Sequence, residues 1–281
     1  MFAYAGAMTA PPPSRPPRPL VMGILNVTPD SFSDGGLYFR QADAVARGRE
    51  MTAEGADVVD VGGESTRPGA EPVDETEELR RVVPVVEALA GDVRVSVDTT
   101  KARVARAAVA AGATLLNDIS GSLWPVAAEL AVGWVSMHMR GTPATMQSLL
   151  DYDDVVAEVH AFVLGRAEAA FGAGVEEVWV DPGIGFAKSA EQNLQLLAAL
   201  PELARSAADI GARVLIGTSR KRFLGRYGGA GDGAEWETPA TDRLEASLAT
   251  AVWCMANGVT MVRVHDVAAT AQAAVLVGGA A

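Results

Sequence analysis

Cysteine, histidine and aromatic residues are scarce in this sequence. Of 281 residues, one is cysteine and three are histidine, and aromatic residues make up 6%. Cys254 has no partner for an internal disulfide, and the apolar, helix-like run around it indicates packing rather than a reactive thiol. No grouping of histidine and cysteine has the spacing of a zinc site, which argues against a transition metal. These features fit a reducing cytoplasm.

Long hydrophobic runs are also absent, since none reaches the ~18 residues of a membrane-spanning helix. The opening segment MFAYAGAMTAPPPSRPPRPL lacks a basic start and an uninterrupted apolar stretch, which argues against a signal peptide. Its proline and arginine content predicts a flexible leader over residues 1–19. The net charge of −12 argues against a nucleic-acid surface. Local arginine and lysine side chains can still bind a small anion.

Short apolar runs alternate with helix-like segments along the remaining chain. Eight such strand–helix units predict a (β/α)₈ barrel, or TIM barrel, as a single domain over residues 20–281. The expected strands cover residues 21–27, 57–62, 93–97, 114–116, 134–137, 178–180, 214–216 and 261–264. The expected helices cover residues 42–54, 75–90, 101–111, 125–131, 153–173, 190–199, 243–257 and 267–277, with another that starts at residue 220.

A polar residue follows most of these strands within a few positions. In a (β/α)₈ barrel the C-terminal ends of the strands open onto one face, where active sites lie. Residues that are far apart in the chain are therefore expected to meet in one mouth. They are Asn26, Asp98, Asn117, His138, Asp181, Lys221 and His265.

The first two loops of this face are rich in glycine, proline and hydroxyl groups. Residues 26–36 (NVTPDSFSDGG) cannot continue a strand and are expected to form a mobile loop. Asn26 at its base suits a phosphate or a metal ion, or else caps a turn. In residues 62–69 (GGESTRPG), Thr66 offers a hydroxyl and Arg67 a forked cation for a carboxylate or phosphate.

Acidic residues at the middle strands indicate ligand contacts. Asp98 follows the run VSV and suits a ligand better than packing, whereas Asp118 either serves a ligand or caps the next helix. Met137 is flexible enough to lie on a flat ring. His138 is either a ligand contact or a hydrogen-bonded barrel residue. Asp181 precedes a glycine-rich turn that lets the chain close over a ligand.

Basic residues gather after the last two strands. Residues 219–222 (SRKR) are expected to open a helix whose N-terminal amides favour an anion, although the two arginines suit a solvated face equally well. Arg263 and His265 alternate on one strand and therefore point to the same side. The loops after strands 7 and 8 are the usual phosphate site of this fold. Glu177, by contrast, is expected to be an ordinary surface residue.

Together these motifs resemble those of the dihydropteroate synthase family, the folate-pathway enzymes that sulfonamides inhibit. The matching stretches run in family order from about residue 20 to about residue 275. They are MGILNVTPDSFSDGG, DVGGESTRPGA, SVDTTKARVARAAVAAGA, NDISG, MHMRGTPATMQ, DPGIGFAK, IGTSRKRFLG and VRVHDV. The resemblance implies a barrel that joins 6-hydroxymethyl-7,8-dihydropterin diphosphate to 4-aminobenzoate and releases pyrophosphate with Mg²⁺.

The resemblance also implies a role for each residue of the mouth. The residues implied to bind the pterin edge are Asp98, Asn117, Asp181 and Lys221. Asn26 is the implied metal ligand, and Thr66, Arg263 and His265 hold the diphosphate. Ile119, Met137 and Phe186 line the slot of the flat ring. Arg67, Ser219 and the first two loops build the aminobenzoate site, and Gly217 is a further substrate contact. The catalytic set is Lys221, Arg263, His265 and Asp98. A homodimer is also implied, and the expected location, from the single cysteine, is cytoplasmic.

Three features depart from the family pattern. The segment after Asn117 and Asp118 is short, which predicts a trimmed fourth helix. Arg222 stands where many members carry a serine that helps to hold the aminobenzoate carboxylate. The last helix is short and ends VLVGGAA.

Two other functions fit parts of the pattern. A methyltetrahydrofolate–corrinoid methyltransferase shares the pterin acids but holds no diphosphate, so Arg263, His265 and the SRK stretch favour the synthase. A paralogue that binds pterin without turnover is the second alternative. The intact set of site residues argues against it.

Overall fold

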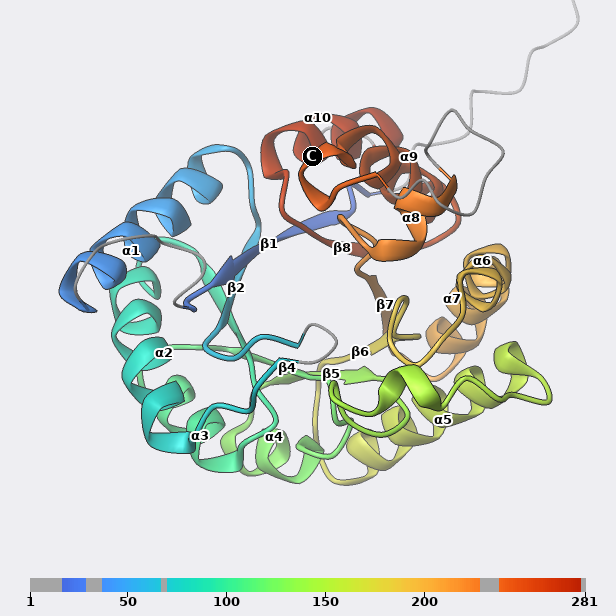
Figure 1. The fold of residues 1–281 in the computed structure, drawn as a ribbon. Helices are drawn as coiled ribbons and strands as arrows, with labels where there is room; N and C mark the ends of the chain where they lie inside the picture. Colours follow the sequence, from blue (N-terminus) through green and yellow to red (C-terminus); the bar gives the residue numbers. More distant parts are fainter. Residues whose placement is uncertain (1–16, 29–36, 67–69, 228–237, 279–281) are drawn as a thin grey trace, which may run out of the picture.

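We describe a computed structural model of the chain, which covers residues 17–28, 37–66, 70–227 and 238–278. In these residues the strands form one closed parallel barrel in the order of the sequence, from β1 to β8. Figure 1 looks into this ring, and the helices surround it. The predicted (β/α)₈ fold is confirmed. The strands are β1 (Leu20–Asn26), β2 (Val58–Gly62), β3 (Arg94–Asp98), β4 (Leu115–Asp118), β5 (Gly133–Met137), β6 (Val178–Asp181), β7 (Arg213–Ile216) and β8 (Met261–Val264).

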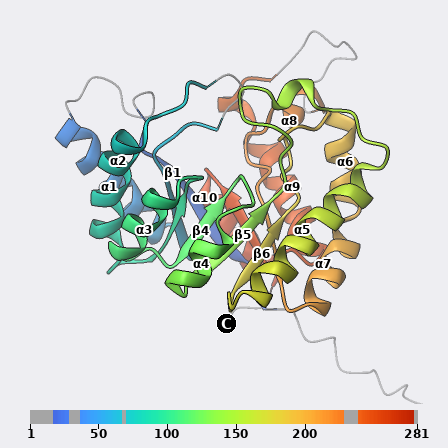
Figure 2. The same cartoon turned by 90° about the horizontal axis from the view of Figure 1, so that it is seen from below.

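The helices lie between the strands in sequence and outside them in space, as the side view in Figure 2 also shows. In the described part of the chain, short 3₁₀ helices cover Met146–Ser148 and Ala240–Asp242. The α-helices are α1 (Leu37–Ala53), α2 (Glu75–Leu89), α3 (Ala102–Ala110), α4 (Trp124–Leu130), α5 (Val155–Gly172), α6 (Ala190–Ala198), α7 (Leu200–Asp209), α8 (Arg222–Tyr227), α9 (Leu244–Ala256) and α10 (Val267–Val277). Among the described residues, no helix combines the length and hydropathy that a membrane span needs.

Local signals fix several helix starts. The side chains of Asp74 and Asp154 accept backbone N–H groups at the starts of α2 and α5. Ser189 and Gln192 form a reciprocal capping box at the start of α6. The predicted helix 190–199 corresponds to α6, but the sequence interpretation missed α7, which begins directly after it. Pro201 stands in the first turn of α7, where proline is tolerated.

The strands separate two apolar regions. Alternate residues face the barrel axis, where a compact cluster fills the interior. It consists of Met22, Val58, Leu115, Val135, Trp179, Leu215 and Met261. The larger cluster lies between the outer face of the strands and the helices. The filled interior leaves the C-terminal ends of the strands as the place where polar side chains can meet.

Ion pairs between side chains lie at the opposite, N-terminal end of the barrel strands. Arg94 donates to both carboxylate oxygens of Glu177, at 3.0 and 2.6 Å, and the indole N–H of Trp179 donates to Glu177 at 2.8 Å. Arg213 lies 3.8 Å from the same carboxylate. Glu177 is therefore not the ordinary surface residue that the sequence suggests, since it joins β3, β6 and β7 at the base.

The ends of the chain fall partly outside the described residues. The leader predicted for residues 1–19 is described only from residue 17 onward. There Arg18 forms an ion pair with Asp57, which also accepts the backbone N–H of Val21 at 2.8 Å. The last part of the predicted leader thus contacts the start of β1 and β2.

Candidate active site

A buried network of polar side chains lies at the C-terminal ends of the strands. Arg263 on β8 reaches two carboxylates: its Nε lies 2.7 Å from Asp60 Oδ2 on β2, and its Nη2 lies 2.8 Å from Asp98 Oδ2 on β3. Asn117 on β4 donates from Nδ2 to the same Asp60 oxygen at 2.9 Å. The structure thus brings together Asp98, Asn117 and Arg263 from three strands that are distant in sequence.

Asp60 is the site residue that the sequence interpretation missed. It is completely buried and orients both Arg263 and Asn117. The signal was present, because a carboxylate inside the apolar run VVDVGG has to face the barrel axis when its neighbours face the helices. Asp60 Oδ1 and Ser96 Oγ, on register-paired residues of β2 and β3, are buried without hydrogen-bond partners among the described residues.

A second part of the network surrounds β6. Asp181 accepts the backbone N–H of Gly183 at 2.8 Å and pairs in register with Met137. Lys221 donates to the carbonyl of Ile184 at 2.7 Å, and its Nζ lies 4.0 Å from the centroid of the Phe186 ring. The turn after β6 therefore carries the contacts of both ionic groups.

Burial shifts the acid–base properties of these groups toward neutrality. Burial raises the pKa of Asp98 to about 7, although the positive charge of Arg263 opposes the shift. Burial also raises the pKa of Asp181, against the hydrogen bond from Gly183 and the charge of Lys221. Burial lowers the pKa of Lys221 to about 7, and the negative charge of Asp181 acts in the other direction. Perturbed groups gathered in one place are typical of functional sites.

The segment after β7 differs in detail from its prediction. The helix α8 begins at Arg222 rather than at 220, because Arg220 has φ of +58° and cannot be helical. The Arg220 side chain pairs with Asp266, at 3.1 and 2.6 Å. Ser219 is buried; its Oγ lies 3.0 Å from His265 Nδ1 and accepts the His265 backbone N–H at 3.1 Å. Ser219 and His265 thus lie together beside the network.

Asp118 is a structural residue. It accepts hydrogen bonds from the backbone N–H groups of Ser120, Ser122 and Leu123, at 2.6–2.9 Å, and the Trp134 indole lies 3.3 Å away. It therefore holds the loop between β4 and α4. The predicted role as a cap of the next helix is wrong in detail, because the N-cap residue of α4 is Leu123, which makes no side-chain cap hydrogen bond. The helix α4 is short, as expected.

The remaining predicted residues are distributed around the same face. Asn26 ends β1 beside Gly62, and Thr66 follows β2 in the loop. Gly217 packs beside Arg263, where an added Cβ would lie 3.6 Å from Arg263 Cβ. Ile119 and Met137 are buried. Arg67 and residues 29–36 lie outside the described residues.

His138 is buried and hydrogen-bonded within the fold. Its Nδ1 lies 3.0 Å from Nζ of Lys188, which is buried too. Burial lowers the pKa of His138 to about 3, and the charges of Lys188 and Arg140 lower it further. This is the second of the two roles that the sequence left open for His138.

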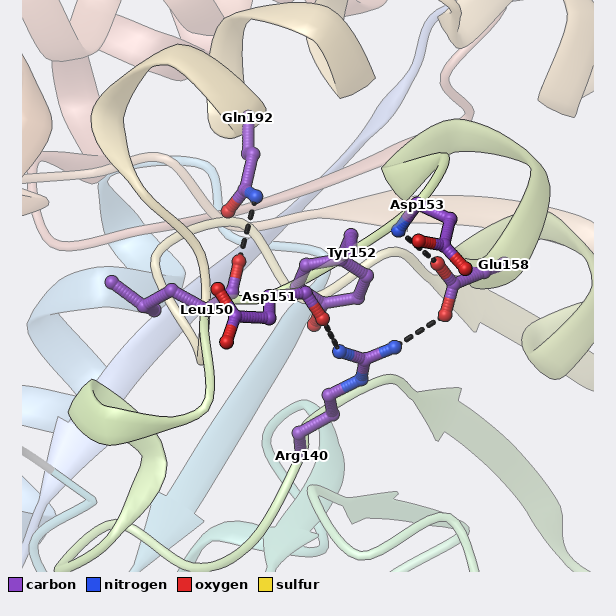
Figure 3. Close-up of a pocket in the computed structure, with 7 residues that line it drawn as sticks. All are labelled: Arg140, Leu150, Asp151, Tyr152, Asp153, Glu158 and Gln192. Atoms are coloured by element: carbon purple, nitrogen blue, oxygen red, sulfur yellow. Dashed lines mark hydrogen bonds and ion pairs between the residues drawn. The ribbon is translucent and has the colours of Figure 1, made fainter.

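A hollow of about 440 Å³ lies outside this network, between the β5–α5 loop and α6 (Figure 3). The guanidinium of Arg140 stacks 3.6 Å from the centroid of the Tyr152 ring and binds Glu158. Gln192 donates to the carbonyl of Leu150 at 2.8 Å. The polar groups that line the hollow thus bind one another. The Tyr152 hydroxyl also donates to the carbonyl of Ala187 at 3.0 Å, so this lining residue supports the turn after β6.

Comparison with known proteins agrees with this geometry. A family model described as pterin binding enzyme matches residues 22–265. The dihydropteroate synthase of Mycobacterium leprae is 48% identical over 267 residues, which are 92% of this chain and 92% of that protein. The chain belongs to the dihydropteroate synthase family.

Solved structures of the family have the same fold. One is the Xanthomonas albilineans dihydropteroate synthase with 4-aminobenzoic acid, at 46% identity and a TM-score of 0.82, with 92% of each chain covered. The same enzyme in complex with 7,8-dihydropteroate gives 43% identity and a TM-score of 0.79, again with 92% of each chain covered. Membership of this family makes the chain a transferase of folate biosynthesis.

Proposed function

We infer that this chain joins 6-hydroxymethyl-7,8-dihydropterin diphosphate to 4-aminobenzoate, with release of pyrophosphate. The observation that carries this conclusion is the single polar network in which Asp98, Asn117 and Arg263 meet, with Asp181 and Lys221 beside it. A flat heterocycle with an anionic tail needs acidic acceptors for its N–H edge and cations for its phosphates. The network supplies both at the C-terminal face of the barrel.

We propose that Asp98, Asn117, Asp181 and Lys221 bind the pterin edge. Ionised carboxylates only accept hydrogen bonds, so Asp98 and Asp181 suit the row of N–H donors that a pterin presents. The amide of Asn117 suits a mixed edge, and Lys221 can donate to the ring carbonyl. An analogue without the N–H groups leaves buried carboxylates unpaired, which costs several kcal/mol.

The flat ring and the second substrate need further residues. Ile119, Met137 and Phe186 are the proposed apolar lining of the ring slot, and Ser219 is proposed to contact the aminobenzoate. Arg67, outside the described residues, is the proposed partner of the aminobenzoate carboxylate. The exposed Arg222 replaces the serine of many family members and can serve the same carboxylate as a second cation.

The site fits Mg²⁺, which we propose as the cofactor. Gly62 pairs in register with both Asn26 and Asp98, and a Cβ on it would lie 3.4 Å from Asp98 Cβ and 3.8 Å from Asn26 Oδ1. The missing side chain thus leaves room between two oxygen donors, and Mg²⁺ prefers oxygen ligands that include substrate phosphates. We propose that Asn26 holds the ion. When bound, it neutralises charge on the departing pyrophosphate.

The residues then support a substitution without a covalent enzyme intermediate, in which the C–O bond breaks early because the electron-rich dihydropterin ring shares the positive charge left on the methylene carbon. The bond between the pterin methylene carbon and the diphosphate oxygen breaks, and its electron pair leaves with pyrophosphate. Arg263 and His265, with Thr66, are proposed to stabilise that negative charge. The two hydrogen bonds to Asp60 and Asp98 use two of the five N–H donors of Arg263, so others remain for phosphate. The aminobenzoate nitrogen attacks the same carbon with its lone pair, and the resulting ammonium loses its proton to solvent.

Turnover of the purified protein tests this function. We expect dihydropteroate and pyrophosphate to form when the folded protein meets pterin diphosphate, 4-aminobenzoate and Mg²⁺. The variants Lys221→Ala and Asp181→Asn should lose most activity, whereas Glu87→Gln, an exposed site on α2, should match wild type. Pterin binding without product would instead identify a non-catalytic paralogue. Absence of both binding and product from folded protein would reject the proposal.

We further propose that the enzyme is cytoplasmic and that it is a homodimer, as the family resemblance implies. Sedimentation at micromolar concentration should give a mass of about twice 29.1 kDa. A single species at the monomer mass would contradict this.

A further inference from the structure

The turn that follows β6, residues 182–188, folds around the ammonium group of its own last residue. Lys188 is only 5% exposed, and its Nζ donates to the carbonyl oxygens of Gly183 at 3.1 Å and Phe186 at 2.9 Å. The carbonyl of His138 lies 3.4 Å from the same nitrogen, and His138 Nδ1 lies 3.0 Å from it. A buried ammonium is costly unless its donors are satisfied, and here every donor has an acceptor.

His138 completes this arrangement as an acceptor. Burial lowers the pKa of Lys188 to about 7, although the negative charge of Asp181 opposes the shift. In its ammonium form Nζ can only donate, so Nδ1 then accepts and the ring proton lies on Nε2. The low pKa of His138 agrees with a neutral ring, since a second positive charge would face Lys188. The Phe162 ring packs edge-on against His138, with centroids 5.0 Å apart, and holds the imidazole in place. The pair thus joins the end of β5 to the turn after β6.

The turn has an unfavourable backbone that needs this support. Gly183 has φ of +68°, and a Cβ there would lie 1.9 Å from the His138 carbonyl oxygen. Ala187 has φ of +49°, which is costly for a residue with a side chain. The hydrogen bonds of Lys188 hold the chain in this close approach to β5.

Two groups proposed to bind the pterin take their positions from the same turn. The N–H of Gly183 fixes Asp181, and the carbonyl of Ile184 fixes the ammonium of Lys221. Phe186, whose carbonyl accepts from Lys188, places its ring against Lys221. A change at Lys188 is therefore transmitted to both ionic groups without any contact between Lys188 and substrate.

We propose that Lys188, with His138 as its acceptor, is a positioning residue for the pterin half of the active site. The proposal rests on the proposed function. It assigns the β6 turn to the pterin and leaves the aminobenzoate to the first two loops and Ser219. Loss of the ammonium should therefore weaken one substrate selectively.

The first test replaces Lys188 with methionine, which keeps the length of the side chain and removes its donors. We expect Lys188→Met to raise KM for pterin diphosphate at least tenfold, with KM for 4-aminobenzoate within twofold of wild type. The dissociation constant of 6-hydroxymethylpterin, measured by calorimetry, should rise in parallel. Arg205→Met, which removes an exposed cation from α7, is the matched control and should leave all three values unchanged.

A second pair of variants decides the case if Lys188→Met does not fold. His138→Asn keeps an acceptor near the position of Nδ1, whereas His138→Leu removes it. We expect the asparagine variant to stay within threefold of wild type and the leucine variant to raise the pterin KM. Wild-type values for Lys188→Met or His138→Leu, or an equal rise in both KM values, would overturn the proposal. A wild-type protein without turnover or pterin binding would overturn the proposed function instead.

Discussion

At the scale of single residues, the acid–base groups of the mouth predict a narrow pH optimum. Asp98 accepts pterin N–H groups on both oxygens only when ionised, since protonation turns one oxygen into a donor, and its pKa is raised to about 7. The acid limb of kcat/KM for pterin diphosphate should therefore fall near pH 7 rather than near 4. Lys221 donates most strongly as a charged ammonium, and its pKa is lowered to about 7, so activity should fall again above that pH.

Lys221→Arg separates the two limbs of this profile. A guanidinium stays charged to high pH, so the alkaline limb should move well above pH 7 while the acid limb stays in place. The measurement is kcat/KM for pterin diphosphate between pH 5 and 10, compared with Glu87→Gln. An alkaline limb identical to that of wild type would show that Lys221 is not the group that titrates.

Asp60 gives a second prediction at this scale. Asp60→Asn keeps the shape of the side chain but removes the counter-charge of Arg263 and places one amide against that of Asn117. Breaking one partner of a buried ion pair costs about 3–5 kcal/mol. We expect kcat/KM for pterin diphosphate to fall by about 100-fold, and urea unfolding to show lower stability. Near-normal kinetics would mean that Asp98 alone orients Arg263.

At the scale of elements, a buried ionic group ties the second loop to its neighbours. Lys101, which precedes α3, pairs with Glu78 on α2 and with Glu64 in the β2–α2 loop. Glu78 is completely buried, and Glu64 also accepts the backbone N–H of Val73 at 3.0 Å. Glu64, two residues before Thr66, is thus joined through Lys101 to Glu78 on α2.

Removal of the Lys101 ammonium should destabilise the fold mainly because the buried carboxylate of Glu78 loses its ion-pair partner. We expect Lys101→Met to lower the free energy of unfolding by about 3 kcal/mol, because Glu78 then lacks its counter-charge. The double variant with Glu78→Gln should recover part of that loss. Urea unfolding of the single and double variants measures the difference, and strictly additive effects would contradict a coupled pair.

Helices and strands were more predictable than the turns between them. Every expected strand occurs, because parallel strands buried on both faces read as apolar runs. The helix α7 was missed because Pro201 reads as a break, although proline is also tolerated in a first helical turn. The start of α8 was misplaced because the left-handed conformation of Arg220 leaves no mark in the sequence. Likewise, the support of the β6 turn by Lys188 depends on contacts between distant segments.

At the scale of the whole molecule, one stabilising ionic cluster lies at the opposite end of the barrel from the chemistry. Glu177 joins three strands at the base, and the apolar interior separates it from the mouth. We expect Glu177→Ala to lower the midpoint of thermal unfolding by several degrees and to leave both KM values unchanged. Arg94 and Arg213 lose their shared acceptor in this variant. A changed KM would mean that the two ends are coupled.

The order of the strands explains how much of the site could be predicted from the sequence. Strand order in a (β/α)₈ barrel follows chain order, so the sequence alone predicts that residues at the strand ends meet. Asp98, Asn117 and Arg263 do so. What the chain order does not give is which of these side chains pair with one another, since that depends on the shear of the barrel and on Asp60 one layer below.

The strands of the barrel differ in how many residues pair with each neighbouring strand. β7 pairs with each neighbour through two residues, whereas β2 pairs with each of its neighbours through five. Local opening of the barrel is therefore expected at β7 before it occurs at β2. Lys221 lies in the loop that follows β7, whereas Asp60 lies on β2, so we expect local opening to widen the mouth near Lys221 rather than near Asp60.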